Sequence, residues 1–130
     1  MVEATKSIPY PTIPNSGAMS EFVGAFDVPS KVTDFVYHCR FSHGWNAIAT
    51  RHSDTMDCKF FVDGKGVILG LAHTGFVAFR DRSGRNLSDR EASYIAAQYL
   101  RERLEQEDEH SLYDVAVADV LRIIDQLAIQ

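Results

Sequence analysis

The segment from Met56 to Ala72 constrains the fold more than any other part of the sequence. It consists of two apolar, β-rich runs joined by the short stretch Asp63-Gly64-Lys65-Gly66. A glycine-containing turn between two such runs is the strongest short-range signal for a β-hairpin. The sequence therefore predicts an antiparallel hairpin at the centre of the fold.

Helices are predicted after this hairpin. Ser88 and Glu91 have the spacing of a capping box, in which each side chain satisfies a free backbone N–H of the first helical turn. A helix is therefore expected from about Asp89 to Gln106. Its apolar residues share one face; they are Ala92, Ile95, Ala96, Tyr99, Leu100 and Leu104. A second helix is expected over about Leu112 to Ala128, with Ser111 and Asp114 as a weaker cap.

The chain before the hairpin is more ambiguous. Thr33 to Phe41 fits both strand and helix spacing, and its aromatic and β-branched residues favour a strand. Ser42-His43-Gly44 predicts a turn, and Trp45 to Arg51 a second strand or a short helix. Ser20 to Phe26 is compatible with one turn of helix, and residues 76–80 with a further strand.

These elements predict an α+β fold. We expect an antiparallel β-meander of about four to five strands, followed by two C-terminal helices packed on one sheet face. Residues 1–17 contain Pro9, Pro11 and Pro14, which exclude helix and predict an extended arm. The arm is either a disordered leader or, as we favour, packs apolar side chains on its own domain or a neighbouring subunit. Residues 18–130 are expected to form a single domain.

The composition limits the possible functions. With 45% hydrophobic residues among 130, the chain has enough apolar material for one core. A net charge of −5 argues against a nucleic-acid or anionic-membrane partner. Apolar runs fall short of the roughly 20 residues that a membrane span needs. Two cysteines are too few for a disulfide framework, and the first residues do not resemble a secretory signal, so we expect a reduced, cytoplasmic protein.

Histidine and cysteine residues are the first candidates for chemistry. Their spacing matches no established zinc pattern, and we predict neither a metal site nor a cofactor. Both Cys39 and Cys58 lie in apolar runs, where burial disfavours the reactive thiolate. The enzymatic alternative is a small-ligand-binding enzyme or hydrolase with a cleft histidine, and its candidate residues are His38, His73 and Cys58.

An anion site is the sharpest local hypothesis. Arg82 and Arg85 directly precede the helix start at Ser88, where free N–H groups and the helix dipole attract negative charge. These three residues are the predicted contacts for a small anion or an acidic partner.

The expected surplus of apolar surface points to an interaction role. Trp45, Phe61, Phe76 and Phe79 cannot all face one buried side of the predicted sheet, and the second helix is apolar beyond a single stripe. The arm and the helices, a second sheet or a partner would have to cover the excess. The sequence therefore favours a non-enzymatic binding or protein-interaction module that forms a homodimer through the sheet face or the second helix.

Overall fold

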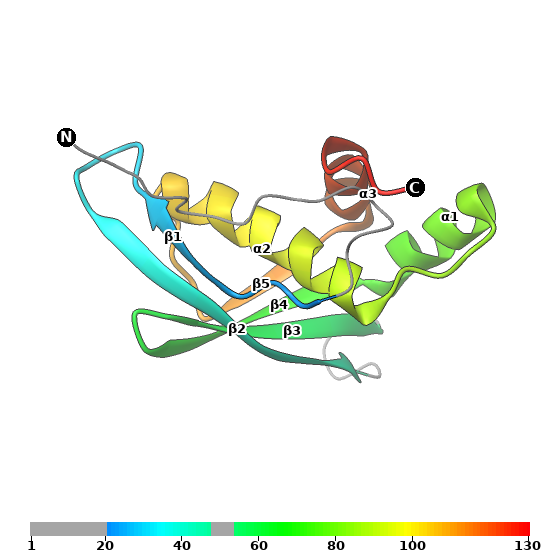
Figure 1. Ribbon diagram of the computed structural model, residues 1–130, viewed down its shortest axis with the longest axis horizontal. Coiled ribbons are helices and arrows are strands. Elements are labelled where there is room, and N and C mark those ends of the chain that lie inside the picture. Colours follow the sequence, from blue (N-terminus) through cyan, green and yellow to red (C-terminus); the bar gives the residue numbers. More distant parts are fainter. Residues whose placement is uncertain (1–20, 48–53) are drawn as a thin grey trace.

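The computed structural model describes residues 21–47 and 54–130, which form five strands and three helices (Figure 1). In chain order these are β1 (Ala25–Pro29), β2 (Val36–Ala47), β3 (Thr55–Val62), β4 (Lys65–Ala72), α1 (His73–Ser83), α2 (Asp89–Glu105), β5 (Leu112–Val115) and α3 (Val117–Gln126). The predicted α+β class is confirmed. The predicted arm over residues 1–17, the domain boundary after it and the end of the predicted 45–51 strand lie outside the described residues.

The strands form one sheet in the order β1-β2-β3-β4-β5. Strands β1 to β4 are antiparallel neighbours, as expected of a meander, whereas β5 runs parallel to β4. A parallel pair needs a long crossover connection, and α1 and α2 provide it. The meander prediction is thus right for four strands, and the fifth strand returns to the sheet only after two helices.

The predicted hairpin is formed by β3 and β4. Val62 pairs with Lys65, so Asp63 and Gly64 are the two loop residues. Both have positive φ, 50° and 82°, which is the signature of a type I′ turn. The right-handed twist of the two strands matches this turn.

The predicted capping box is also confirmed. The Ser88 hydroxyl accepts a hydrogen bond from the Glu91 N–H at 3.0 Å, and the Ser88 N–H donates to Glu91 Oε1 at 2.8 Å. The helix that follows, α2, buries the predicted apolar face; its residues Ala92, Ile95, Ala96, Leu100 and Leu104 are all almost inaccessible to solvent.

The predicted strand over residues 76–80 is wrong, because this segment belongs to α1. A short apolar run does not distinguish a strand from a helix by periodicity. In the fold, Phe79 is buried and its neighbour one turn back, Phe76, is partly buried. The helix ends at Ser83, and the N–H of the following residue, Gly84, donates to the Arg80 carbonyl at 2.8 Å.

The second predicted helix starts five residues later than expected. Leu112–Val115 forms β5, in which Tyr113 and Val115 are buried and alternate with the exposed Leu112 and Asp114. Register with β4 pairs Ile68 with Leu112 and Leu71 with Val115. The proposed Ser111–Asp114 cap is therefore wrong, and the C-terminal helix is α3 alone.

Two expectations before the hairpin also change. The predicted helical turn over Ser20–Phe26 is wrong for the described residues of this range, because residues 22–24 are irregular and Ala25 and Phe26 belong to β1. The predicted strand over Thr33–Phe41 is confirmed within β2, but Ser42-His43-Gly44 does not turn the chain. The strand continues through these residues, and its register against β3 shifts between Phe41 and His43.

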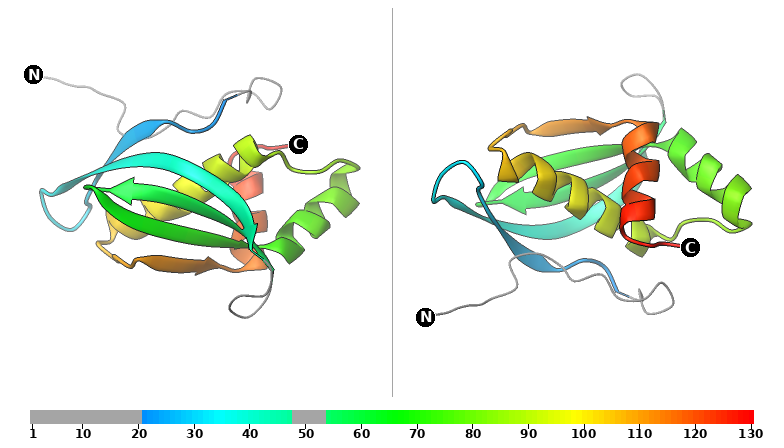
Figure 2. Two further views of the ribbon diagram at one scale, coloured as in Figure 1. Left: turned by 90° about the horizontal axis from the view of Figure 1, so that it is seen from below. Right: turned by 90° about the horizontal axis from the view of Figure 1, so that it is seen from above.

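The helices cover one face of the sheet. Figures 1 and 2 show α2 lying along the sheet and α3 beside it on the same side, as predicted. The core between them contains side chains from the centre of the sheet and from both helices, among them Phe60, Leu69, Ile95, Leu100 and Ile123. Helix α1 continues from the end of β4 and packs against α3.

Candidate functional site

The opposite face of the sheet is the candidate functional surface. Strand residues alternate between the two faces of a sheet, so Cys39, Phe60 and Leu69 point to the core and their sequence neighbours point away. Within the described residues no helix covers this second face, which we call the outer face (Figure 2). Its principal side chains are those of Asp27, His38, Arg40, His43, Trp45, Asp57, Lys59, Phe61 and Ile68, of which Asp57 is buried.

A β-bulge decides which aromatic residues reach the outer face. Before the bulge, Phe41 pairs with the buried Phe60; after it, Trp45 pairs with Asp57 on the outer side. The extra residue reverses the alternation, as β-bulges do. Gly44 then faces the core at close range, where a Cβ would lie 3.0 Å from the Met56 Cε and 3.1 Å from the Asp57 carbonyl oxygen.

Trp45 is exposed as a consequence of this bulge. Its relative exposure is 36%, and its indole stacks on the imidazole of His43 with ring centroids 5.1 Å apart. An exposed tryptophan on a regular strand is a large apolar surface held at low conformational cost. It is the largest apolar side chain on the outer face.

A cluster of cations and an aromatic ring lies next to it. The Arg40 guanidinium is 4.4 Å from the centroid of the Phe61 ring, and the Lys59 amine is 5.1 Å from it. Both distances are in the range of cation–π attraction. Arg40 and Phe61 are direct cross-strand partners, so this arrangement follows from the register of β2 and β3.

A hollow of about 290 Å³ borders the cluster and is lined in part by His38, Arg40 and Phe61. His38 Nδ1 lies 2.8 Å from the Asp27 carboxylate across the β1–β2 pair. This hydrogen bond, reinforced by the charge of Asp27, raises the pKa of His38 above its usual value. The outer face thus carries Arg40 and Lys59 around the Phe61 ring, and it also carries the carboxylates of Asp27, next to His38, and Asp57, next to Trp45.

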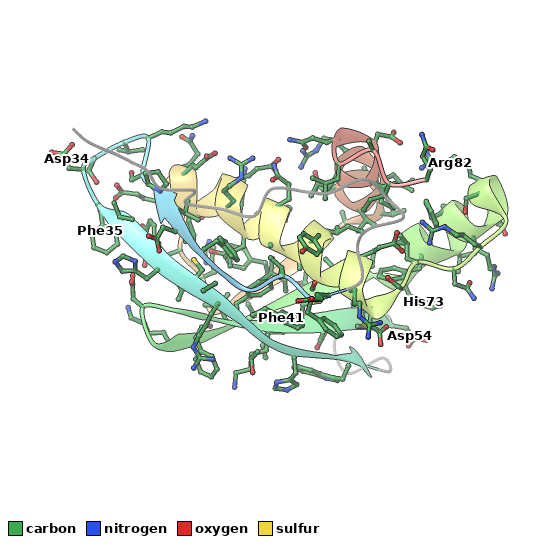
Figure 3. The ribbon with its side chains drawn as sticks, viewed as in Figure 1. Asp34, Phe35, Phe41, Asp54, His73 and Arg82 are labelled. Atoms are coloured by element: carbon green, nitrogen blue, oxygen red, sulfur yellow. The ribbon has the colours of Figure 1, made fainter. Side chains whose placement is uncertain are left out.

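The three cleft residues predicted for an enzyme are not brought together. His38 lies near the turn that joins β3 and β4, whereas His73 follows the opposite end of β4, where its N–H donates to the Asp54 carbonyl. Figure 3 shows His73 beside Asp54, at the end of the sheet away from Phe35. Cys58 is fully buried beneath α2, with its Sγ 4.0 Å from the Ala92 carbonyl oxygen. The strand between these sites is eight residues long, which separates its ends by roughly 25 Å.

The two thiols occupy the core. Cys39 and Cys58 are buried free cysteines. Burial, reinforced by nearby aspartates, raises the pKa of each thiol to about 12. Because the thiolate is the nucleophilic form, both side chains act as core residues.

The predicted anion contacts have partners within the protein. The Arg85 guanidinium donates two hydrogen bonds to the Glu91 carboxylate, at 2.9 and 2.8 Å, and others to backbone carbonyls. Arg82 pairs with Asp125 at 3.3 Å, and Ser88 caps α2. Burial alone would raise the pKa of the Glu91 carboxyl, but hydrogen bonds from Arg85 and Ser88 outweigh it and hold that pKa below its usual value. Anion binding here stays a prediction.

No group of three or more His, Cys, Asp and Glu residues in 21–47 and 54–130 is arranged to hold a metal ion. None of the helices in these ranges combines the length and apolar character that crossing a membrane requires. No protein-family model, curated protein or solved structure matches this chain.

The sequence analysis does not identify the two cations of the outer face, Arg40 and Lys59. It identifies Trp45 and Phe61 as aromatic residues that cannot all be buried on one face of the sheet. Gly44 was the available signal, because an isolated glycine within a strand pattern indicates a bulge. Reading Ser42-His43-Gly44 as a turn concealed that the residues on either side belong to one strand.

Proposed function

We propose that this protein is a non-enzymatic interaction module that binds an acidic segment of a partner protein on its outer face. The observation that carries the proposal is the grouping of Trp45 with Phe61, Arg40 and Lys59 on a sheet face that no described helix covers. Tryptophan and arginine are enriched among the residues that dominate binding energy at protein interfaces. Here both stand on β2, and Lys59 and Phe61 stand on the neighbouring central strand β3.

The charge of this face selects the kind of partner. Arg40 and Lys59 carry positive charge at its centre, whereas His38 is paired with the Asp27 carboxylate. Complementary charge steers encounter and excludes wrong partners. An extended segment that alternates acidic and apolar residues would contact both the cations and the exposed indole.

A second copy of the chain fits this face less well. Two copies meeting centre to centre would place Arg40 and Lys59 of one chain against the same cations of the other, which is unfavourable. The other expected dimer surface, the C-terminal helix, is largely used within the domain, since Val120, Ile123 and Ile124 of α3 are buried. We therefore prefer a heterologous partner to the homodimer.

The buried free thiols support a reducing environment for this interaction. Disulfides rarely persist where glutathione and thioredoxin keep thiols reduced. The cytoplasm is the compartment we propose on this basis.

Trp45 provides the assay, because it is the only tryptophan in the chain. A synthetic peptide that alternates glutamate and leucine is titrated while Trp45 fluorescence is recorded, beside a matched peptide with glutamine in place of glutamate. We expect the acidic peptide to change the emission and the neutral one to bind about tenfold more weakly. Added salt should weaken the binding.

Charge-reversal variants test the location. Arg40→Glu and Lys59→Glu should each weaken binding of the acidic peptide about tenfold. Arg80→Glu is the matched control, because it makes the same charge change at an exposed position on α1. Equal loss in all three variants, equal binding of the neutral peptide, or tighter binding of a single-stranded oligonucleotide would overturn the proposal. A stable dimer in light scattering that Arg40→Glu dissociates would assign the face to a second copy instead.

A further inference from the structure

A cavity at the end of the sheet is distinct from the hollow on the outer face, with which it shares Asp63 alone among its lining residues. It has a volume of about 230 Å³ and lies between the β3–β4 turn, the last turns of α2 and the segment that leads into β5. Its floor is apolar and consists of side chains of Val62, Val67, Leu100 and Leu104, each of them buried. An apolar cavity of about 150 Å³ holds a benzene molecule, so this one accommodates an apolar group together with a small polar head.

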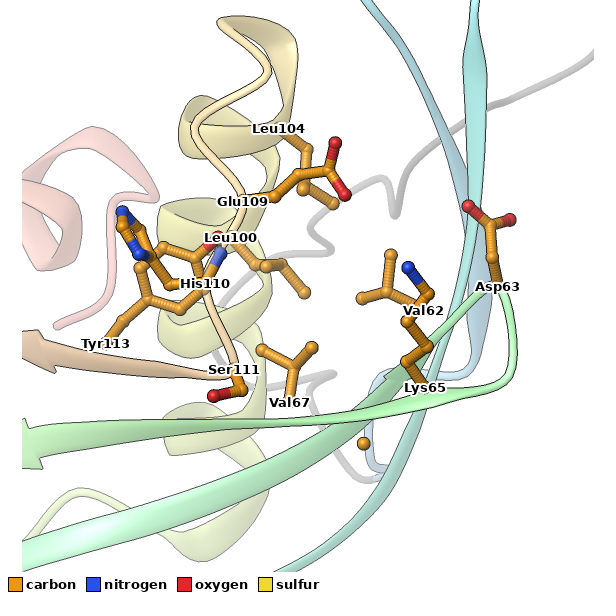
Figure 4. A pocket seen from close by; sticks show the side chains of 11 residues that line it. Val62, Asp63, Lys65, Val67, Leu100, Leu104, Glu109, His110, Ser111 and Tyr113 are labelled. Atoms are coloured by element: carbon orange, nitrogen blue, oxygen red, sulfur yellow. Dashed lines mark hydrogen bonds between the residues drawn. The ribbon is translucent and has the colours of Figure 1, made fainter.

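Lys65 and two acidic residues, Asp63 and Glu109, stand on the rim of this cavity. Asp63 accepts a hydrogen bond from the His38 N–H at 3.0 Å. Figure 4 shows Lys65 on the wall formed by the β3–β4 hairpin and Glu109 on the facing wall, above the apolar floor. Among the described residues, no side chain forms an ion pair with either of them. Each is therefore available to a ligand that enters the cavity.

A hydrogen bond from Tyr37 holds the Glu109 carboxylate in place. The Tyr37 hydroxyl donates a hydrogen bond to Glu109 Oε2 at 2.8 Å, and Tyr37 is itself buried. Burial and the neighbouring Glu109 raise the pKa of this hydroxyl, so it remains protonated and donates. The bond occupies one carboxylate oxygen, and no described residue donates to the other.

We propose that this cavity binds a free apolar α-amino acid as its zwitterion. The ligand carboxylate pairs with Lys65, its ammonium pairs with Glu109, and its side chain packs on the floor formed by Val67, Leu100 and Leu104. A ligand with a single charge would compensate only one of the Lys65 and Glu109 side chains as it displaces water from both, which is unfavourable. The proposal is independent of the partner proposed for the outer face.

The experiment is a titration with leucine, monitored by amide resonances of the whole chain. Shifts are expected at residues 65–67 and 109–113, and not at Arg40 or Gly84. Three comparison ligands each lack one feature of leucine: 4-methylpentanoate has no ammonium, leucinamide has no carboxylate, and glycine has no apolar side chain. Each should bind about tenfold more weakly than leucine, which corresponds to about 1.4 kcal/mol.

Variants then assign each charge to its ligand group. Lys65→Ala should weaken leucine about tenfold and leave leucinamide unchanged, whereas Glu109→Gln should weaken leucine and leave 4-methylpentanoate unchanged. Both residues are exposed, so the variants should fold, and Arg80→Ala is the control for a general loss of charge. Absence of shifts at millimolar leucine, shifts outside the cavity, or equal binding of leucine and 4-methylpentanoate would overturn the proposal. Arg40→Glu should bind leucine normally, which keeps this outcome separate from that of the outer face.

Discussion

Gly75 tests the packing of α1 against α3. A Cβ at this position would lie 2.7 Å from the Cγ1 and 2.9 Å from the Cβ of Val120, which is fully buried. Valine is stiff at χ1 because it is branched at Cβ, and its Cβ is fixed to the backbone. Neither atom can rotate away, so the Gly75→Ala methyl must push the two helices apart.

Two opposing contributions decide whether Gly75→Ala raises or lowers the free energy of unfolding. Alanine is favoured over glycine inside a helix by up to about 1 kcal/mol, and Gly75 lies in the first turn, where the gain is smaller. Overpacking a well-filled core costs about 1–3 kcal/mol. We expect Gly75→Ala to lower the free energy of unfolding by about 1–2 kcal/mol, measured by urea denaturation followed by circular dichroism.

A double-mutant cycle separates the contact from other effects. Val120→Ala removes the Cγ1 that makes the closer contact but keeps the Cβ. It should therefore remove only part of the steric clash with a methyl group at position 75. The coupling energy between the two substitutions should be about 1 kcal/mol. Gly24→Ala is the control, because nothing lies within 4 Å of a Cβ built there, and it should change stability by less than about 0.5 kcal/mol. A Gly75→Ala variant as stable as the wild type, or a coupling near zero, would refute the close approach.

Three further predictions concern the turn, the Arg85–Glu91 ion pair and the thiols. Gly64→Ala should destabilise by about 1 kcal/mol in urea denaturation, because φ is 82° and the space around its Cβ is open, leaving only the conformational penalty. Arg85→Ala should lower the free energy of unfolding by about 1–2 kcal/mol, which is less than for a fully buried pair because the Arg85 side chain is 40% exposed. Arg82→Ala removes an exposed ion pair and should lower the free energy of unfolding by less than about 0.5 kcal/mol. The folded-state pKa of Glu91 is below its unfolded value, so this stabilisation is present above about pH 4.5 and is lost as the pH falls through the folded-state pKa; the difference between wild type and Arg85→Ala should therefore shrink in acid. The two cysteine thiols should resist labelling by a thiol reagent at neutral pH until denaturant is added, because burial raises their pKa values to about 12.

The elements predicted correctly are those that a few adjacent residues determine. Two residues of positive φ set the hairpin at Asp63-Gly64, and two side chains three residues apart set the start of α2 at Ser88. Each signal acts within one turn of chain and does not depend on the rest of the fold.

The elements predicted wrongly depend on partners far away in the sequence. Leu112–Val115 becomes a strand because β4 offers it an edge at Ile68 to Leu71, and nothing in its own residues announces that pairing. Arg85, one of the predicted anion contacts, shows a different limit. Its partner Glu91 is only six residues away, but the capping-box pattern assigns the Glu91 carboxylate to Ser88 and does not reveal its further acceptor capacity, which the Arg85 guanidinium uses.

The bulge in β2 links the fold to the proposed function. Tyr37, Cys39 and Phe41 are odd-numbered residues that face the core, and without the bulge Trp45 would follow them under α2. The core there is already filled by the Met56 and Cys58 side chains, which approach the Cβ position of Gly44 to 3.0 and 3.8 Å. The bulge thus does two things at once: it lets a residue without a side chain meet the crowded core, and it turns the indole toward the cations of the outer face. The strand that completes the core therefore also supplies the exposed aromatic anchor on which the proposed interaction depends.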